Sequence, residues 1–111
     1  MNMPGQIVFS EQKIKEAFEK LANGTEEEKT LYKWILRAFK DLENNAYCGI
    51  QLPKNLIPKI YVKNYDIKNL WKYDLPKAWR LIYSVENTDI KVVSIILEWF
   101  DHKNYERRFG Y

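Results

Sequence analysis

A small set of side chains in the last third of the chain can bind a phosphate ester and move protons. Arg80 carries a planar guanidinium that can hold a phosphate through two parallel hydrogen bonds. His102 is the one histidine in the sequence, and its imidazole exchanges protons near neutral pH. Its neighbour Asp101 can orient that ring, and Tyr105 can stack on a base or hydrogen-bond to a phosphate.

Positive charge is concentrated around these residues. Residues 1–50 contain seven Lys and Arg against eight Asp and Glu, whereas residues 51–111 contain eleven against seven. The window 52–80 holds seven cations against Asp66 and Asp74, with tryptophan and tyrosine among them. Such a mixture is typical of a nucleic-acid surface, although a solvated lysine-rich face has the same composition. The candidate RNA or phosphate contacts are Lys72, Lys77, Lys103, Arg107 and Arg108.

Length and composition favour one globular domain over residues 1–111, since 46% of the residues are hydrophobic and 30% are charged. No apolar run reaches about 18 residues and no secretory signal is evident, so we expect a cytoplasmic protein outside the membrane. Cys48 is the single cysteine, which excludes an internal disulfide; we expect it to be a small core residue. With one cysteine, one histidine and scattered glycines, neither a metal site nor a cofactor is expected.

The first half of the chain predicts a strand and two helices. Residues 6–9 are typical of a short strand, and Ser10 is a candidate N-cap for the helix that follows. Apolar residues recur at helical spacing over residues 14–21, and an Asn-Gly pair then ends this helix. Thr25 and Glu28 match a capping box at the start of a second, longer helix. The tight connection indicates an antiparallel helix pair.

The second half predicts strands after an irregular connector. Glycine and proline interrupt residues 46–69, where Pro58 can open a short helix over residues 59–63. Strands rich in β-branched and aromatic residues are predicted over residues 70–75, 79–85 and 91–99. Residues 86–89 are the predicted hairpin turn.

This order of elements predicts an α+β fold. An N-terminal strand and helix hairpin should pack on one face of a mostly antiparallel sheet that includes three C-terminal strands. Alternation along the middle strand places Trp79, Leu81, Tyr83 and Val85 on one face and Arg80, Ile82 and Ser84 on the other. We expect the face with Arg80 to be concave and open to a partner. A further hypothesis is that Phe109 and Tyr111 reach back to the sheet.

Two segments resemble the RelE/ParE superfamily of toxins from toxin-antitoxin systems. In that family a strand of the form aromatic-Arg-Leu-aliphatic-Tyr precedes a hydrophobic strand, which ends in a basic cluster and a tyrosine. Here residues 79–83 read WRLIY and residues 102–105 read HKNY. The specific part of the resemblance spans residues 70 to 109, and the order of elements agrees over most of the chain. The resemblance therefore implies a RelE-like fold.

The resemblance implies two activities. RelE-type members cut messenger RNA in the ribosomal decoding site without a metal, and ParE-type members bind and poison DNA gyrase. Antitoxins neutralise members of both kinds. We expect a ribosome-dependent mRNA endoribonuclease that inhibits translation, monomeric when free, with the ribosome, mRNA and a cognate antitoxin as partners. The alternatives are a non-catalytic toxin that binds gyrase and a RelE-fold module that has lost toxicity.

The resemblance also assigns expected roles. Cleavage needs a base for the 2′-hydroxyl, a cation for the phosphate and an acid for the leaving 5′-oxygen. Arg80 matches the family's strand arginine, while His102 and Tyr105 match its basic or imidazole group and its C-terminal tyrosine. These three are the expected catalytic residues. The chain departs from the pattern one strand earlier, where an ungapped match puts aromatic residues at the family's lysine positions, with Lys72 between them. The general base is therefore unidentified.

Overall fold

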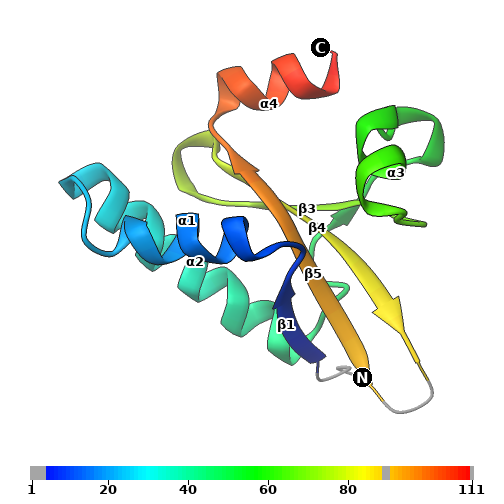
Figure 1. The fold of residues 1–111 in the computed structure, drawn as a ribbon, viewed down its shortest axis with the longest axis horizontal. Helices are drawn as coiled ribbons and strands as arrows, with labels where there is room; N and C mark the ends of the chain where they lie inside the picture. Colours follow the sequence, from blue (N-terminus) through cyan, green and yellow to red (C-terminus); the bar gives the residue numbers. More distant parts are fainter. Residues whose placement is uncertain (1–4, 89–90, 111) are drawn as a thin grey trace.

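The computed structural model describes residues 5–88 and 91–110, which form an α+β fold around one mixed sheet (Figure 1). In chain order the elements are β1 (Gly5–Phe9), α1 (Gln12–Leu21), α2 (Glu26–Asn44), β2 (Ile50–Gln51), the 3₁₀ turn η1 (Lys54–Leu56), α3 (Lys59–Tyr65), β3 (Trp71–Asp74), the 3₁₀ turn η2 (Pro76–Ala78), β4 (Arg80–Asn87), β5 (Val92–Phe100) and α4 (His102–Phe109). No helix in the described part is long and apolar enough to cross a membrane.

The sheet has the strand order β1-β5-β4-β3-β2, and β1 runs parallel to β5 whereas the other pairs are antiparallel. The predicted α+β class and mostly antiparallel sheet are therefore confirmed. The β4–β5 hairpin pairs Arg80 with Phe100 at one end and Asn87 with Val92 at the other. Because β4 continues through Asn87, the hairpin turn starts later than predicted, and Asp89 of the predicted turn lies outside the described residues.

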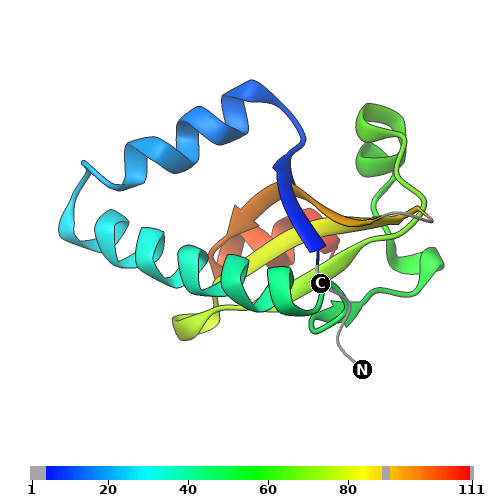
Figure 2. The same cartoon turned by 90° about the horizontal axis from the view of Figure 1, so that it is seen from below.

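Helices α1 and α2 cover one face of the sheet, as predicted (Figure 2). The capping box of α2 is present: the Thr25 hydroxyl accepts a hydrogen bond from the Glu28 N–H, and the Glu28 carboxylate accepts one from the Thr25 N–H. Rings from three elements meet beneath the helices, with the centroid of Phe18 5.2 Å from that of Phe39 and 5.6 Å from that of Phe9. This is the larger of the two buried clusters.

Two local predictions in this region are wrong. Ser10 does not cap α1, because its backbone N–H still extends the sheet by donating to the Ile96 carbonyl at 2.9 Å. Glu11 occupies the N-cap instead, without a side-chain hydrogen bond to the helix. Cys48 is exposed rather than buried, since Ala46 supplies the side chain that enters the core after α2.

The opposite face of the sheet is covered, which corrects the expectation of an open concave surface. A second cluster of Leu52, Tyr61, Leu70, Ile82, Leu97 and Tyr105 lies there beneath α3 and α4. The reason is visible in β5, whose nearly continuous apolar sequence leaves Ile96 and Leu97 both fully buried on opposite sides of the strand. Phe109 stacks on Tyr105, as the hypothesis of a returning C-terminus requires, whereas Tyr111 lies outside the described residues.

Candidate functional site

The candidate site lies where β3, β4 and α4 meet at one end of the sheet (Figure 1). Arg80 begins β4 and pairs with Asp74 of β3. Lys72 lies two residues before Asp74, so strand alternation places its side chain on the same face as those of Asp74 and Arg80. The structure thus brings together the matched arginine and the lysine whose equivalence the sequence left open.

A single carboxylate oxygen joins these two cations. Asp74 Oδ1 lies 3.0 Å from Arg80 Nε and 3.3 Å from Lys72 Nζ. The Arg80 and Lys72 side chains are each 18% exposed, whereas that of Asp74 is 48% exposed. Two partly desolvated cations therefore converge on one anionic oxygen near the surface. A phosphate oxygen carries the same charge and accepts the same donors.

The ring of Tyr105 packs against both Lys72 and Arg80. The ring centroid of Tyr105 lies 5.4 Å from Arg80 Cζ and 5.7 Å from Lys72 Nζ, within the range of cation–π attraction. The residue is only 2% exposed, and its ring also stacks on Phe109 with centroids 4.5 Å apart. Because the ring is enclosed by these neighbours, its position suits holding the cations rather than stacking on a base.

His102 opens α4 at the surface. Its side chain is 59% exposed, and Nε2 contacts the carboxylate of Glu106 one helical turn later, an ion pair when the imidazole is protonated. Asp101 does not orient the ring, because its carboxylate caps α4 by accepting the Asn104 N–H at 2.8 Å. This capping corrects the expected role of Asp101, and Glu106 is the carboxylate that holds the imidazole.

Apart from Lys72, the predicted RNA contacts fall into three groups, of which Lys77 is the last. Lys103 and Arg107 are exposed on α4. Arg108 is engaged, since its Nη1 lies 3.0 Å from Glu98 Oε2. Arg108 Cζ also lies 5.7 Å from the ring centroid of Tyr61 and 5.2 Å from that of Phe100. Arg108 therefore fastens α4 to β5 and α3 in this structure.

Lys77 lines a cleft that neither Arg80 nor Lys72 lines. The residue belongs to the η2 turn, where Lys77 and Ala78 have φ values of 56° and 63°, a conformation that costs free energy for residues other than glycine. Lys77 lines a separate cleft of about 530 Å³ together with Trp34 and Trp79. The structure therefore does not join Lys77 to the Arg80 and Lys72 pair.

Sequence reasoning missed the carboxylates that engage these cations. Asp74 meets Arg80 through the strand register, which no local pattern reveals. Glu106 could have been found, because residues four apart on a helix are neighbours. Glu98 faces Arg108 only because α4 turns back over β5. Among residues 5–88 and 91–110, no group of three His, Cys, Asp or Glu is placed to hold a metal ion.

Comparison with known proteins adds no family: no protein-family model, curated protein or solved structure matches this chain at a significant level. The functional argument therefore rests on the geometry of Arg80, Lys72, Asp74 and Tyr105. In that geometry the buried ring of Tyr105 contacts both Arg80 and Lys72. The exposed imidazole of His102 lies on the same helix, α4, as Tyr105.

Proposed function

We propose that this chain is a toxin of the RelE/ParE kind that cleaves messenger RNA on the ribosome. The observation that carries the proposal is the convergence of Arg80 and Lys72 on one oxygen of Asp74 from adjacent strands. A scissile phosphate that takes the place of this carboxylate meets both cations at once. The order of strand, helix hairpin and mostly antiparallel sheet is compatible with such a fold.

In the proposed reaction the 2′-hydroxyl oxygen attacks the phosphorus and the bond from phosphorus to the 5′-oxygen breaks. Negative charge builds on the non-bridging oxygens, where the Arg80 guanidinium and the Lys72 ammonium stabilise it. His102, at the exposed start of α4, takes the proton of the 2′-hydroxyl and then gives it to the leaving 5′-oxygen, so the products are a 2′,3′-cyclic phosphate and a 5′-hydroxyl. Tyr105 positions the two cations and does not touch the RNA.

Binding to the ribosome is assigned to the outer surface of α4. Lys103 and Arg107 are exposed there, and cations so placed neutralise RNA phosphates. A monomeric cytoplasmic toxin with a cognate antitoxin completes the proposal, and no cofactor is invoked.

The test is cleavage of a defined messenger on ribosomes from the source organism, read by primer extension beside the same RNA without ribosomes. Wild-type protein should cut only in the ribosomal A site, and Arg80→Ala should lose the cuts. Lys20→Ala, which removes an exposed cation from α1, is the matched control and should cut like wild type. Unchanged cutting by Arg80→Ala would refute the proposed site.

One observation favours a second function, binding of DNA gyrase without catalysis. Glu106 holds His102 and Asp74 holds Arg80, so the proton-transfer group and the cation are each engaged within the protein. A binding surface needs no acid or base. Inhibition of gyrase supercoiling without any messenger cleavage would establish this alternative. Absence of both activities would indicate a fold that has lost toxicity.

A further inference from the structure

Helices α3 and α4 contact each other over the face of the sheet that carries Arg80 (Figure 1). Tyr61 of α3 stacks on Phe109 of α4, with ring centroids 5.9 Å apart. The guanidinium of Arg108 lies over the same tyrosine, with Cζ 5.7 Å from the ring centroid. These ring contacts fix the position of one helix relative to the other, so the surface between the two helices has a defined shape.

A cleft of about 610 Å³ lies between the two helices. It is lined by the start of α3, the end of β5 and one side of α4, through Pro58, Ile60, Phe100, Asn104, Arg107 and Arg108. The three α4 residues recur at i, i+3 and i+4, which places them on one side of that helix. The described residues that line the cleft include two cations and no carboxylate, so the cleft suits an anionic ligand.

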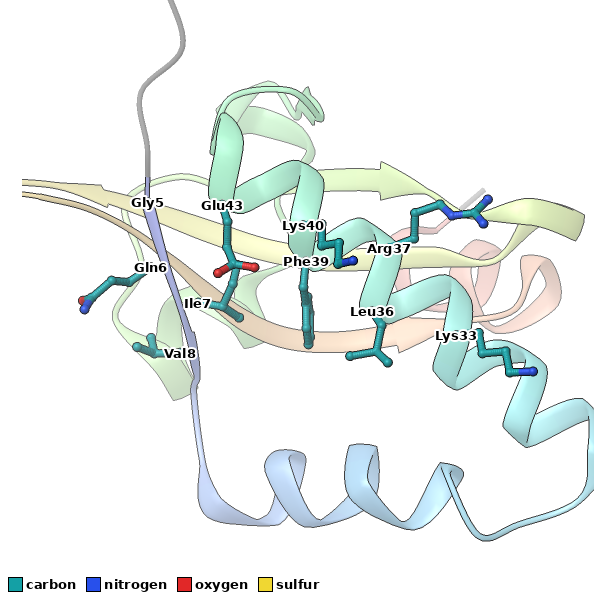
Figure 3. Close-up of a pocket in the computed structure, with 10 residues that line it drawn as sticks. All are labelled: Gly5, Gln6, Ile7, Val8, Lys33, Leu36, Arg37, Phe39, Lys40 and Glu43. Carbon is teal, nitrogen blue, oxygen red and sulfur yellow. The ribbon is translucent and has the colours of Figure 1, made fainter.

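Phe100 connects this cleft with the cations of the candidate site. It pairs with Arg80 across the β4–β5 hairpin, and directly opposed residues of antiparallel strands point to the same face. The larger groove in Figure 3, of about 740 Å³, lacks this connection, because β1 and α2 supply its lining. A ligand chain that extends from Arg80 along its own face of the sheet therefore reaches the cleft between α3 and α4.

The cleft contains side chains that are available to a ligand. Arg107 is exposed and takes part in none of the ion pairs found in the described part of the chain. Asn104 is also exposed, and within the same residues its side-chain amide makes no hydrogen bond. On the α3 side, Ile60 is 41% exposed beside the half-buried Pro58. A cation, an amide and an apolar surface thus border one cleft.

We infer that this cleft binds a nucleotide of single-stranded RNA. Arg107 holds a phosphate, the base lies against Pro58 and Ile60, and the amide of Asn104 hydrogen-bonds to the edge of the base. Adenine fits best, because an asparagine amide can make two hydrogen bonds with its N6 and N7 atoms. RNA is favoured over an acidic peptide because the cleft continues from the phosphate-binding cations on the same face. That the bound nucleotide flanks the scissile phosphate rests on the proposed function.

The probe is a 2′-O-methylated triadenylate, whose blocked 2′-oxygens prevent cleavage. Its binding to the full chain is measured by NMR titration at constant salt, because phosphate contacts weaken as salt rises. We expect saturable shifts at Ile60, at the Phe100 ring and at the side-chain amide of Asn104. The matching triuridylate should bind about tenfold more weakly, since uracil lacks the N6 and N7 pair.

Two substitutions and a matched control locate the site. Arg107→Ala should weaken triadenylate binding about tenfold, whereas Arg37→Ala, which removes an exposed arginine from the groove in Figure 3, should leave it unchanged. Asn104→Ala should bind triadenylate and triuridylate equally. The inference is overturned if triadenylate does not bind at millimolar concentration, if both arginine variants weaken binding equally, or if Asn104→Ala keeps the full preference. It is equally overturned if a polyglutamate peptide displaces triadenylate from the cleft and binds there more tightly.

The ribosome assay separates this inference from the proposed function. On messengers whose A-site codons differ only in adenine or uracil beside the cut, wild type should cleave the adenine codon faster and Asn104→Ala should not. Cleavage that depends on Arg80, without codon preference and without triadenylate binding, would overturn this inference alone. Triadenylate binding in the cleft without cleavage of any messenger would overturn the proposed function and leave the nucleotide site standing.

Discussion

The two faces of the sheet bury different chemistry. Beneath α1 and α2 the cluster of described buried residues contains no charged side chain, and the rings of Phe9, Phe18 and Phe39 meet at centroid distances of 5.2 to 5.9 Å. Beneath α3 and α4, charges lie against the rings: Arg80 covers Tyr105 and Arg108 covers Tyr61. One face is therefore built chiefly for stability, and the other holds cations in place while they remain partly exposed.

A single strand shows how this difference arises. Along β4 the residues Leu81, Tyr83 and Val85 enter the larger core, while Ile82 enters the smaller one. Arg80 lies on the same face as Ile82 but at the start of the strand, where its side chain keeps 18% of its surface exposed. Strand alternation selects the face, and the end of the strand supplies access to solvent.

The largest expected effect is on the α1 and α2 side. Phe39→Ala should lower the free energy of unfolding by about 3–5 kcal/mol, because it leaves a cavity among packed rings. Leu36→Ala on the same helix removes an exposed side chain and should change it by less than about 1 kcal/mol. Urea denaturation measures both, and Phe39→Leu, with an expected loss of about 1 kcal/mol, serves if the alanine variant does not fold. Equal losses at positions 36 and 39 would contradict the assignment of this core.

The next effect concerns the attachment of α4. Arg108→Ala removes the partner of Glu98 and the cover of Tyr61, and it should destabilise the protein by about 1–3 kcal/mol. Arg107→Ala, an exposed arginine on the same helix, should change stability by about 0.5 kcal/mol or less. Amide exchange in α4 should become faster in the Arg108 variant alone. Identical exchange in both variants would show that Arg108 does not fasten the helix.

The dependence of stability on alkaline pH tests one buried phenol from each face of the sheet. Burial raises the pKa of Tyr83 and of Tyr61, so the folded protein holds each phenolic proton more tightly than the unfolded chain does. The contribution of these two phenols to the free energy of unfolding should therefore be constant below the ordinary phenol pKa of about 10 and should be lost as the pH rises above it. Burial and a hydrogen bond to Asp41 raise the pKa of Tyr73 to about 12, so Tyr73 adds to the fall between about pH 10 and 12.

Replacing either buried phenol should reduce this alkaline loss. Tyr83→Phe also removes hydrogen bonds to the Ala46 carbonyl and from the Gly49 N–H, with an expected loss of about 1–2 kcal/mol at pH 7. Urea midpoints measured from pH 7 to 11 test both variants. A wild-type stability that does not change across this range would refute the argument.

The smallest effects separate the two helix caps. Thr25→Ala at α2 and Asp101→Ala at α4 should each lower the free energy of unfolding by about 1 kcal/mol. Only the Asp101 variant should also slow messenger cleavage, because it loosens the turn that carries His102. Thermal unfolding and the ribosome assay together distinguish the caps. Equal cleavage by both variants would show that the start of α4 does not contribute to the site.

Local chemistry explains which parts of the fold could be predicted from sequence. The capping box at Thr25 and the short helix after Pro58 form where expected, because their signals lie within a few residues. The three C-terminal strands follow from β-branched and aromatic runs. The two-residue strand β2 was not predicted, since it offers no periodicity and forms only by pairing with β3.

The site depended on tertiary register, which sequence alone does not give. Arg80 and Lys72 were recognised as candidates, but their shared partner Asp74 follows from the pairing of β3 with β4. The cover over the second face was also missed. Asp101 as N-cap, followed by Tyr105 and Phe109 four residues apart, is the signal that would have predicted α4 and its buried face.

The most direct test of the division between the two faces is the single-turnover rate of messenger cleavage on ribosomes, measured beside the free energy of unfolding. Arg80→Ala should cleave about 10²–10³ times more slowly at a temperature where it is folded, and the loss of its ion pair with Asp74 should lower its stability by about 1–3 kcal/mol, as expected for Arg108→Ala. Phe39→Leu should lose stability yet cleave at nearly the wild-type rate at a temperature where it is folded. Cleavage by Arg80→Ala at the wild-type rate would contradict the account.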